Sequence, residues 1–324
     1  MSTQQETHAI IIGGGIAGLL AARVLSEHFH CVTILEADDV LNEDAKRKGV
    51  PQQHHIHTLL AKGREILESL YPGLDDELAQ RDVPLLTWGK DTRVLTTGGY
   101  VQSRNTGIQG RAHSRNTLES CVRKRTHALP NVRLLSETRV VDLLHESGRI
   151  VGVQISAHRD KHFLEELHGD LVVDASGRQS QTPDMLKRLG YPTPEEHSVD
   201  PLLGYATRWY RRPATVSLEV PAVLIQPGVI PGFYRGAAAA QAEANQVVIT
   251  LVGVNGDYPP TNETGFQAFA ESLPDPIVAR WLNELEPASP IYGFRAANHI
   301  RHYERLEHNP EGFIVLGDAF CVFN

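Results

Sequence analysis

The chain has 324 residues, of which 41% are hydrophobic and 22% charged, the composition of an ordinary globular protein. Its formal net charge of −8 argues against a nucleic-acid partner, because phosphate binding requires a basic face. The three cysteines lie far apart and form neither a disulfide framework nor a CxxC metal pair, so a reducing compartment is predicted.

The N-terminal region shows no targeting pattern. The first eight residues, MSTQQETH, are polar and lack the basic-then-apolar layout of a signal peptide. The longest apolar run, residues 9–22, is interrupted by four glycines and is shorter than the ~20 residues that a membrane helix needs. These features predict a soluble, cytoplasmic chain with no membrane span.

The first elements predicted are a strand, a helix and a second strand. Residues 9–12 form a continuous apolar run of strand length, glycines follow at once, and residues 16–27 have helical spacing. Residues 32–35 form a second, β-branched strand that ends at Glu36. This order is typical of a βαβ unit whose parallel strands are buried on both faces.

Helices and antiparallel strands follow. An amphipathic helix is predicted over residues 56–70, ending before Pro72, and a second helix over roughly 115–128. Strands are expected at 132–135, 139–146, 150–157 and 171–173.

The composition changes between residues 201 and 290, where prolines and aromatic residues are more frequent. Antiparallel strands and two short helices, near Phe266 and Val278, are predicted there. After Ile291 the chain is expected to return to the first domain through an apolar strand at 313–316.

Gly13, Gly15 and Gly18 match G-x-G-x-x-G between the first strand and the first helix. The first glycine permits a tight turn, the second lets backbone approach a pyrophosphate, and the third allows close packing of the helix on the strand. Glu36 can accept hydrogen bonds from ribose hydroxyls and disfavours a 2′-phosphate. The pattern therefore predicts FAD or NAD rather than NADP, against the alternative that the glycines serve packing alone.

A resemblance over almost the whole chain decides between FAD and NAD. The segments occur in the order GGGIAGLLAARVL, RKGVPQQHHIH, SRNTLESCVRKR, DLVVDASGRQSQTP and GFIVLGDAFCVFN. They resemble the successive motifs of the FAD-dependent monooxygenases of the para-hydroxybenzoate hydroxylase-like superfamily. The resemblance is strong at 8–60 and 110–185, good at 291–324 and weak in between.

The resemblance implies an α/β fold with a Rossmann-like FAD-binding domain of the GR2 type and an inserted, mainly antiparallel β-sheet substrate domain. The FAD-binding domain would comprise residues 1–80, 111–200 and an incomplete part at 291–324. Residues 81–110 would add strands to the substrate domain at 201–290.

Carried over residue by residue, the resemblance also implies a set of contacts with FAD. Arg47 would lie near the flavin and pyrophosphate, Arg115 would reach the ribityl–pyrophosphate region, and the backbone of Val140 would meet the adenine. Without the resemblance, both arginines would be interpreted as solvated surface residues. The full cofactor-binding set is Gly13, Gly14, Gly15, Ile16, Ala17, Gly18, Glu36, Arg47, Arg115, Val140, Asp174, Gly317 and Asp318.

Asp174 matches an aspartate that the family links to both FAD and NAD(P)H. The sequence departs from the family there, because Ala175 and Ser176 stand before Gly177, as in the reductase and halogenase relatives. This departure weakens the expectation of direct NAD(P)H contact. Asp318 matches the carboxylate that binds the ribityl chain.

Three histidines in PQQHHIH, His54, His55 and His57, form a further candidate site. An i, i+2 pair could meet a metal from an extended segment, but no further ligands lie at a suitable spacing, so no metal is predicted. Either the segment is a polar loop leading into a helix, or one histidine bonds the flavin or the substrate. His57 is the catalytic candidate.

The resemblance implies a monooxygenase, a hydroxylase or epoxidase in which reduced flavin and O2 form a C4a-hydroperoxide that transfers oxygen to an apolar or aromatic small molecule. No second G-x-G-x-x-G is present, so electrons are expected from transiently bound NAD(P)H or from flavin reduced elsewhere. Absence of Trp-x-Trp-x-Ile-Pro argues against halogenation. Apolar and aromatic residues expected beside the substrate, each equally well explained as ordinary core, are Tyr205, Trp209, Phe233 and Tyr234.

Two alternatives remain open: an FAD-dependent alkene reductase resembling geranylgeranyl reductases, and a truncated, non-catalytic fragment that holds FAD weakly. The last residues, GDAFCVFN, resemble the family's strand-end motif cut one residue before its proline. In the family a helix follows, and its N-terminus faces the flavin pyrimidine. Asn324 is therefore expected to interrupt the FAD site rather than to end the natural protein.

Overall fold

The computed structural model of the chain describes residues 6–41, 51–57, 59–157, 160–228 and 230–323. The chain divides into two compact units, each assembled from separate stretches of sequence. The first unit comprises Met1–Pro51, Glu119–Val199 and Asn298–Asn324, and the second comprises Gln52–Leu118 and Asp200–Ala297.

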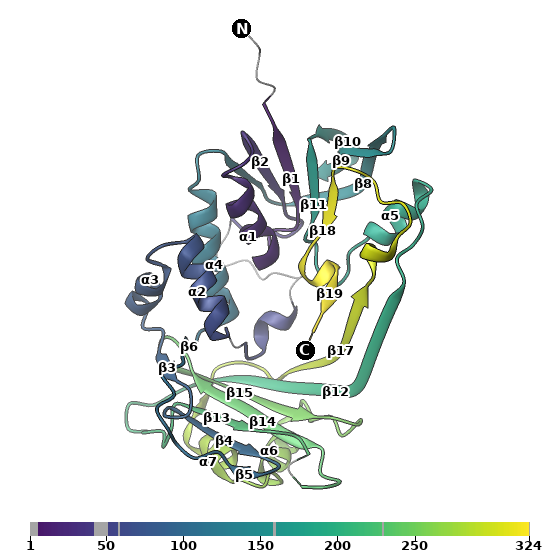
Figure 1. The fold of residues 1–324 in the computed structure, drawn as a ribbon. Coiled ribbons are helices and arrows are strands. Elements are labelled where there is room, and N and C mark those ends of the chain that lie inside the picture. The colour runs from purple at the N-terminus through teal and green to yellow at the C-terminus, as the bar shows by residue number, and fades with distance from the viewer. Residues whose placement is uncertain (1–5, 42–50, 58, 158–159, 229, 324) are drawn as a thin grey trace. The chain divides into compact units, whose positions relative to one another are not determined.

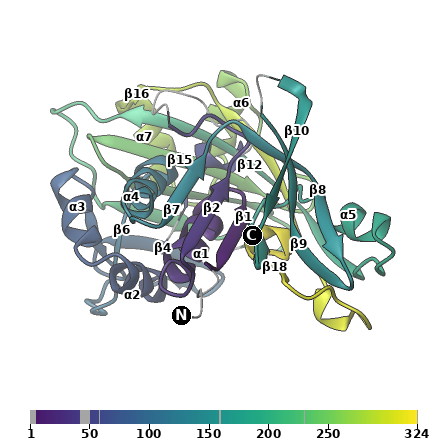
Figure 2. The ribbon, with the colours of Figure 1, turned by 90° about the horizontal axis from the view of Figure 1, so that it is seen from above.

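A five-stranded parallel sheet forms the centre of the first unit. Its order is β18-β11-β1-β2-β7, and every neighbouring pair in it is parallel. Helix α1 (Ile16–Leu25) connects β1 to β2 and lies alongside both strands (Figure 2). The strands are β1 (His8–Ile12), β2 (Cys31–Leu35), β7 (Val132–Leu135), β11 (Leu171–Asp174) and β18 (Phe313–Val315).

A second, antiparallel sheet belongs to the same unit. It has the order β10-β9-β8, formed by β8 (Thr138–Glu146), β9 (Arg149–Ala157) and β10 (Asp160–His168). Helix α5 (Thr182–Arg188) packs nearby, since Met185 and Leu186 join residues of both sheets in one core. That core comprises Ile10, Leu35, Leu143, Ile150, Val153, Ile155, Val172, Met185 and Leu186.

The second unit contains a larger sheet. The order of its strands is β17-β12-β15-β14-β13-β4-β5, and all the pairs with a described register are antiparallel except β13 with β4. Helices α6 (Glu263–Glu271) and α7 (Ile277–Glu284) cover one face of this sheet, as Figure 1 shows. The strands are β4 (Thr92–Thr96), β5 (Gly99–Tyr100), β12 (Glu196–Arg211), β13 (Ala222–Ile225), β14 (Arg235–Gln241), β15 (Gln246–Gly253) and β17 (Tyr292–Arg301).

The core of the second unit lies between this sheet and its two helices. Phe266, Phe269 and Trp281 from the helices are at most 3% exposed, and they pack against Ala237 and Ala239 of β14. At about 25 cal/mol per Å² of buried apolar surface, aromatic side chains of this size contribute several kcal/mol each to the unit.

Shorter elements complete the chain. A two-stranded ribbon joins β3 (Leu85–Thr87) to β6 (Gln109–Arg111), and β16 (Glu286–Pro287) pairs with β12. The remaining elements are η1 (Pro51–His54), α2 (Ala61–Leu70), α3 (Leu74–Gln80), α4 (Arg115–His127), η2 (Tyr303–Arg305), η3 (Gly317–Ala319) and β19 (Cys321–Val322), which pairs with β17.

The predicted α/β architecture, with one parallel sheet and one mainly antiparallel sheet, is confirmed. Several elements were not predicted, among them α3, α5, β10 and β14. The helix predicted over 56–70 begins at Ala61, because Leu60 has an extended backbone. The second unit begins at Gln52, whereas the sequence placed residues up to 80 in the first domain.

Candidate functional site

The glycine-rich turn has the geometry that the sequence predicts for a dinucleotide loop. Gly13 has a φ of +102°, and a Cβ there would lie 2.5 Å from the Ala175 carbonyl oxygen. A Cβ at Gly18 would lie only 1.9 Å from the Gly13 carbonyl oxygen, so α1 approaches the turn as closely as glycine allows. A side chain at either position would push the turn away from its neighbours.

Gly15 differs from these two glycines because a Cβ there would meet nothing within 4 Å. Gly15 is the N-cap of α1, and no side chain caps the helix. The first backbone N–H groups of a helix have no partner within the helix, and they carry a partial positive charge that suits phosphate. The start of α1 therefore fits a pyrophosphate, with open space where the second glycine stands.

Glu36 lies beside this turn and is 7% exposed. The Gly14 N–H donates to its Oε2 at 2.9 Å, and the Asp38 N–H donates to its Oε1 at 2.8 Å. The carboxylate therefore fixes the backbone of the glycine turn, a role that the sequence did not indicate. Each carboxylate oxygen can accept more than one hydrogen bond, so this arrangement is compatible with the predicted ribose contact.

The first residues of β8 lie at the end of β2. The Thr138 N–H donates to the Glu36 carbonyl oxygen at 2.8 Å, and Val140 follows two residues later. Val140 is half-buried, pairs with Ile155 and packs against the core of the first unit. Its predicted backbone contact with adenine stays a prediction.

Asp174 ends β11 and is fully buried. Its Oδ1 accepts from the Ser176 N–H at 2.9 Å and from the Ser176 hydroxyl at 2.6 Å. Its Oδ2 accepts from the hydroxyls of Ser180 at 2.5 Å and Thr182 at 2.6 Å. These four bonds hold the segment after β11, including the Ala175 carbonyl, against Gly13. The side chain therefore positions the loop, and its predicted contact with a cofactor stays a prediction.

The Gly317–Asp318 turn follows β18 and reaches the same place. The Leu316 N–H donates to the Asp174 carbonyl oxygen at 2.8 Å, which aligns the two strand ends. Gly317 has a φ of +61°, and a Cβ there would lie 2.8 Å from the Cβ of Ala17 on α1. Asp318 is exposed beside the helix start. The structure thus brings together the glycine turn, Ile16, Ala17, Glu36 and the Gly317–Asp318 turn.

Two of the predicted cofactor residues are not part of this group. Arg47 lies outside the described residues. Arg115 is half-buried at the first position of α4 and belongs to the second unit, so its predicted contact with FAD stays a prediction.

Arg123 of α4 is a candidate residue that the sequence did not single out. It forms an ion pair with Glu119, one helical turn earlier, and its Nε is buried without a partner in the described part of the chain. Burial lowers the pKa of Arg123, while the charge of Glu36 opposes this change. The i, i+4 spacing of Glu119 and Arg123 was visible in the sequence, but the proximity of Glu36 was not.

Two further residues lie beside Asp318. His299 is 8% exposed, and burial together with the Arg301 charge lowers its pKa, against the opposing charges of Glu196 and Asp318. Burial and the Asp318 charge raise the pKa of the Cys321 thiol. β17 and β19 bring these side chains together through the pairing of His299 with Val322.

The histidine segment lies in the second unit and is largely engaged in packing. His55 is 6% exposed, and its Nδ1 lies 2.7 Å from the Thr207 hydroxyl. Burial lowers the pKa of His55 to about 4, and the charges of His57 and His54 add to this effect. The His54 ring stacks on Tyr292 at 4.0 Å between centroids, and its carbonyl accepts from the Trp209 indole at 2.9 Å.

A cavity of about 130 Å³ in the second unit includes His57 in its lining. Its wall comes from several segments that are distant in sequence, including β3, β4, β6, β13, β14 and β15. None of Tyr205, Trp209, Phe233 and Tyr234 lines this cavity. Tyr205 instead lies against the His55 ring. The lining residues are Ile56, His57, Leu59, Leu86, Trp88, Thr92, Gly110, Arg111, Ala112, His113, Ala222, Val223, Leu224, Ala238, Ala239, Ala240, Gln241, Ala242 and Val248.

Within the described ranges, no three His, Cys, Asp or Glu side chains are grouped so as to hold a metal ion. Among the described helices, none has both the length and the apolar character needed to cross a membrane.

Comparisons with known proteins found similar sequences and similar folds. A family model described as an NAD(P)-binding Rossmann-like domain matches residues 11–67, which include the glycine turn and Glu36. Protein Rv3254 of Mycobacterium tuberculosis is 34% identical over 334 residues, an alignment that covers 98% of this chain and 69% of that protein. Squalene monooxygenase of Rattus norvegicus is 30% identical over 183 residues, covering 54% of this chain and 29% of the enzyme.

Among solved structures, 2-methyl-3-hydroxypyridine-5-carboxylic acid oxygenase superposes with a TM-score of 0.69 over 98% of this chain and 76% of that one. Its sequence identity is 18%, so this likeness shows the fold alone. Flavin-dependent halogenases share the same fold.

Proposed function

This chain belongs to the FAD-dependent monooxygenase superfamily, and on that premise we propose that it binds FAD and inserts oxygen into an apolar or aromatic small molecule. The reaction would be a hydroxylation or an epoxidation, with NAD(P)H as the reductant. The observation that carries the proposal is the convergence around the start of α1 of the glycine turn, Glu36 and the Gly317–Asp318 turn.

Each part of this group has a distinct task in the proposal. The backbone N–H groups that open α1 would bind the pyrophosphate, and the open space at Gly15 would admit it. Glu36 would accept from the ribose of the adenosine, and Asp318 from the ribityl chain. Arg47, Arg115, Val140 and Asp174 would complete the cofactor site as the family resemblance implies.

Arg123 supports the same assignment for Glu36. The charge of Glu36 acts on the pKa of Arg123, so the two side chains lie close together, and the Glu36 carboxylate oxygens can accept from a ribose hydroxyl. Glu36 would therefore favour a ribose hydroxyl over a 2′-phosphate.

When bound, the flavin would supply the redox chemistry, and the residues of the chain would orient the substrate and exclude water. The cavity that includes His57 is the candidate for the substrate, because its wall is mostly apolar. His57 would orient the substrate or the flavin through its ring nitrogens, one of which lies 2.9 Å from the His55 carbonyl oxygen.

The decisive experiment is reconstitution of the purified chain with FAD. We expect a retained flavin absorption spectrum and, with NAD(P)H, oxygen consumption that depends on substrate and yields a product heavier by one oxygen atom. A product that gains two hydrogens without oxygen consumption would favour the alkene reductase. A folded, colourless protein that does not retain added FAD would contradict the proposed function for this chain.

A further inference from the structure

The cavity of the second unit is about as large as a single ring. Its volume of about 130 Å³ compares with about 150 Å³ for an apolar protein cavity known to bind benzene. Along β14 the side chains alternate, so that Ala237 and Ala239 contribute to the core beneath α6 and α7. Ala238, Ala240 and Ala242 are among the residues that line the cavity, and their short side chains leave its volume open.

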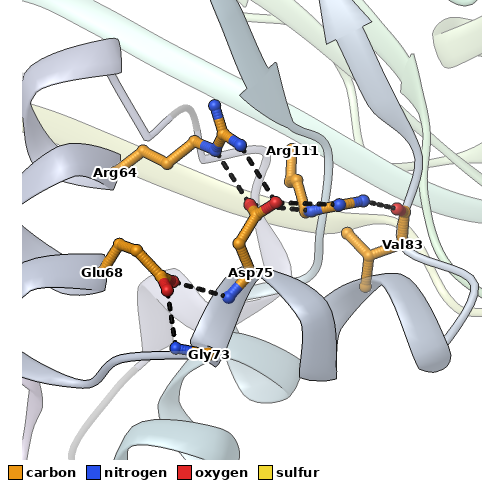
Figure 3. A network of polar contacts seen from close by, with 6 residues as sticks. All are labelled: Arg64, Glu68, Gly73, Asp75, Val83 and Arg111. Carbon is orange, nitrogen blue, oxygen red and sulfur yellow. Dashed lines mark hydrogen bonds and ion pairs between the residues drawn. The ribbon is translucent and has the colours of Figure 1, made fainter.

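Among the described residues of the lining, Arg111 is the one arginine, and it forms an ion pair with Asp75 (Figure 3). Its Nε and Nη2 donate to the two oxygens of Asp75 at 2.9 and 3.0 Å, and its Nη1 donates to the Val83 carbonyl at 2.8 Å. Arg64 donates to the same Asp75 carboxylate at 2.8 and 2.9 Å. Both guanidinium groups hold the pKa of Asp75 well below its usual range.

Glu68 balances the charge of this network. Its oxygens accept from the backbone N–H groups of Gly73 and Asp75 at 2.6 and 2.9 Å, as Figure 3 shows. Its charge also raises the pKa of Arg64, after the larger effect of the hydrogen bond to Asp75. Asp75 pairs with both guanidinium groups, and the charge of Glu68 acts on Arg64, so Arg111 brings no unopposed positive charge to the cavity. A carboxylate ligand would be buried there without a counter-ion, which is costly.

His113 is a polar residue of this lining, and one of its ring nitrogens has no hydrogen-bond partner in the described part of the chain. It is 7% exposed, and its Nδ1 lies 3.1 Å from the Ser114 carbonyl oxygen. A carbonyl oxygen only accepts, so Nδ1 carries the proton and donates it. Burial lowers the pKa of His113, against smaller opposing effects of the Ser114 carbonyl and the Glu243 charge, which favours the neutral ring.

In this tautomer, Nε2 of His113 is an acceptor. It is buried, and it has no hydrogen-bond partner in the described part of the chain. Buried polar atoms in native proteins are nearly always paired, so an unpaired acceptor on a residue that lines the cavity indicates a missing donor. A ligand that brings its own N–H or O–H would provide it.

We propose that this cavity binds a neutral molecule with a ring-sized apolar body and one hydrogen-bond donor, which donates to Nε2 of His113. His113 thus determines specificity for a donor, and Ala238 and Ala240 of β14, together with Ala242, determine the size of the ligand. That the bound molecule is the substrate rests on the proposed function, whereas the binding itself does not.

The test measures binding to the purified chain by calorimetry, without flavin or turnover, using phenol, toluene and benzoate as probes. We expect phenol to bind about five- to tenfold more tightly than toluene, the ratio that one net hydrogen bond supplies, and benzoate to bind weakest. His113→Phe should remove the preference for phenol and leave toluene binding unchanged. His113→Gln, which places an amide oxygen near the position of Nε2, should restore part of it.

Two control variants separate this proposal from a general loss of structure. His308→Phe changes an exposed histidine of the first unit and should leave all three affinities unchanged. Ala238→Leu should weaken phenol and toluene alike by filling the cavity, whereas Ala288→Leu, at an exposed alanine of the second unit, should weaken neither.

Three results would overturn the proposal: equal affinity of the wild-type chain for phenol and toluene, equal loss of both in a folded His113→Phe variant, or no binding of any probe by a protein with an intact thermal transition. Failure to retain FAD would contradict the proposed function and would leave these binding results standing.

Discussion

Glu36 connects the backbone of the glycine turn to the predicted ribose contact through one carboxylate. Its two oxygens accept from Gly14 and Asp38, so the residue contributes to the apo fold before any cofactor binds. A substitution therefore affects both the stability of the turn and the retention of FAD, and these two effects can be measured separately.

We expect Glu36→Ala to lower the free energy of unfolding of the apo protein by about 1–3 kcal/mol, because the buried Gly14 N–H and the part-buried Asp38 N–H lose their acceptor. FAD retention should fall further than this destabilisation explains, since the ribose contact is also removed. Thermal unfolding of the apo protein and titration with FAD measure the two effects. Glu27→Ala, at an exposed glutamate of the same unit, should change neither, and unaltered FAD affinity in Glu36→Ala would contradict the ribose contact.

His55 provides a prediction on pH. Its pKa is lowered to about 4 from the usual 6.5, so between these values the unfolded state binds more protons than the folded state. The contribution of His55 to stability is therefore complete above pH 6.5 and is lost as the pH falls toward 4. The full effect is about 3 kcal/mol, of which about 2 kcal/mol falls between pH 7 and pH 5.

Urea unfolding at pH 7 and pH 5 tests this expectation. His55→Gln cannot titrate, so it should lose about 2 kcal/mol less than the wild type between the two pH values. The same substitution at exposed His308 should leave the wild-type pH dependence in place. An identical pH dependence for wild type and His55→Gln would show that His55 is not held neutral by burial.

At the scale of elements, the approach of α1 to β1 explains why two glycines in one motif have different costs of substitution. At Gly18 a Cβ would lie 1.9 Å from the Gly13 carbonyl oxygen, whereas at Gly15 it would meet nothing within 4 Å. Gly15 also has a φ of −78°, which any residue can adopt. Gly18 is thus required by the fold, whereas Gly15 is required only where a ligand approaches.

We expect Gly18→Ala to lower the free energy of unfolding by about 2–4 kcal/mol, because α1 must move away from the turn. Gly15→Ala should stay within about 1 kcal/mol of the wild type. Its FAD affinity should nevertheless fall at least about tenfold, since the methyl group occupies the space of the pyrophosphate. Apo melting temperatures and FAD titrations of both variants give the comparison, and undiminished FAD affinity in Gly15→Ala would place the pyrophosphate elsewhere.

Elements with a strong local signal were predicted from the sequence. The βαβ unit and α4 have periodic apolar positions, whereas α3 (Leu74–Gln80) and α5 (Thr182–Arg188) are only two turns long and largely polar. Gly15, Gly18 and Glu36 were identifiable because phosphate and ribose recognition requires given residue types at fixed spacing.

The cavity could not be predicted in the same way. Ala238 and Ala240 contribute to it through small size, and His113 through a tautomer fixed by a carbonyl group. Neither property has a sequence pattern. The aromatic residues expected beside the substrate were chosen by residue type. Tyr205 lies against the His55 ring and Trp209 donates to the His54 carbonyl, and their place beside the substrate stays a prediction.

At the scale of the whole molecule, most residues proposed to bind FAD lie in the first unit, with Arg115 as an exception, whereas the cavity lies in the second. Residues of the glycine turn, Glu36 and the Gly317–Asp318 turn belong to the first unit, and the cavity that contains His113 belongs to the second. A ligand that binds only the folded state stabilises it by about 2.7 kcal/mol at a concentration one hundred times its Kd. Each ligand should therefore slow amide exchange mainly in its own unit.

Hydrogen exchange measured with FAD alone and with phenol alone tests this arrangement. FAD should protect peptides that contain residues 13–18, 36 and 316–318. In the proposal it binds the backbone at the start of α1, and its ribityl chain donates to Asp318 in the turn after β18. Phenol should protect peptides that contain 109–113 and 238–242, which border the cavity. At the same ligand concentrations, His113→Phe should weaken the second pattern and keep the first, and Gly15→Ala should weaken the first and keep the second. Protection of residues 238–242 by FAD alone, at the level that phenol produces, would contradict the assignment of the two ligands to separate sites.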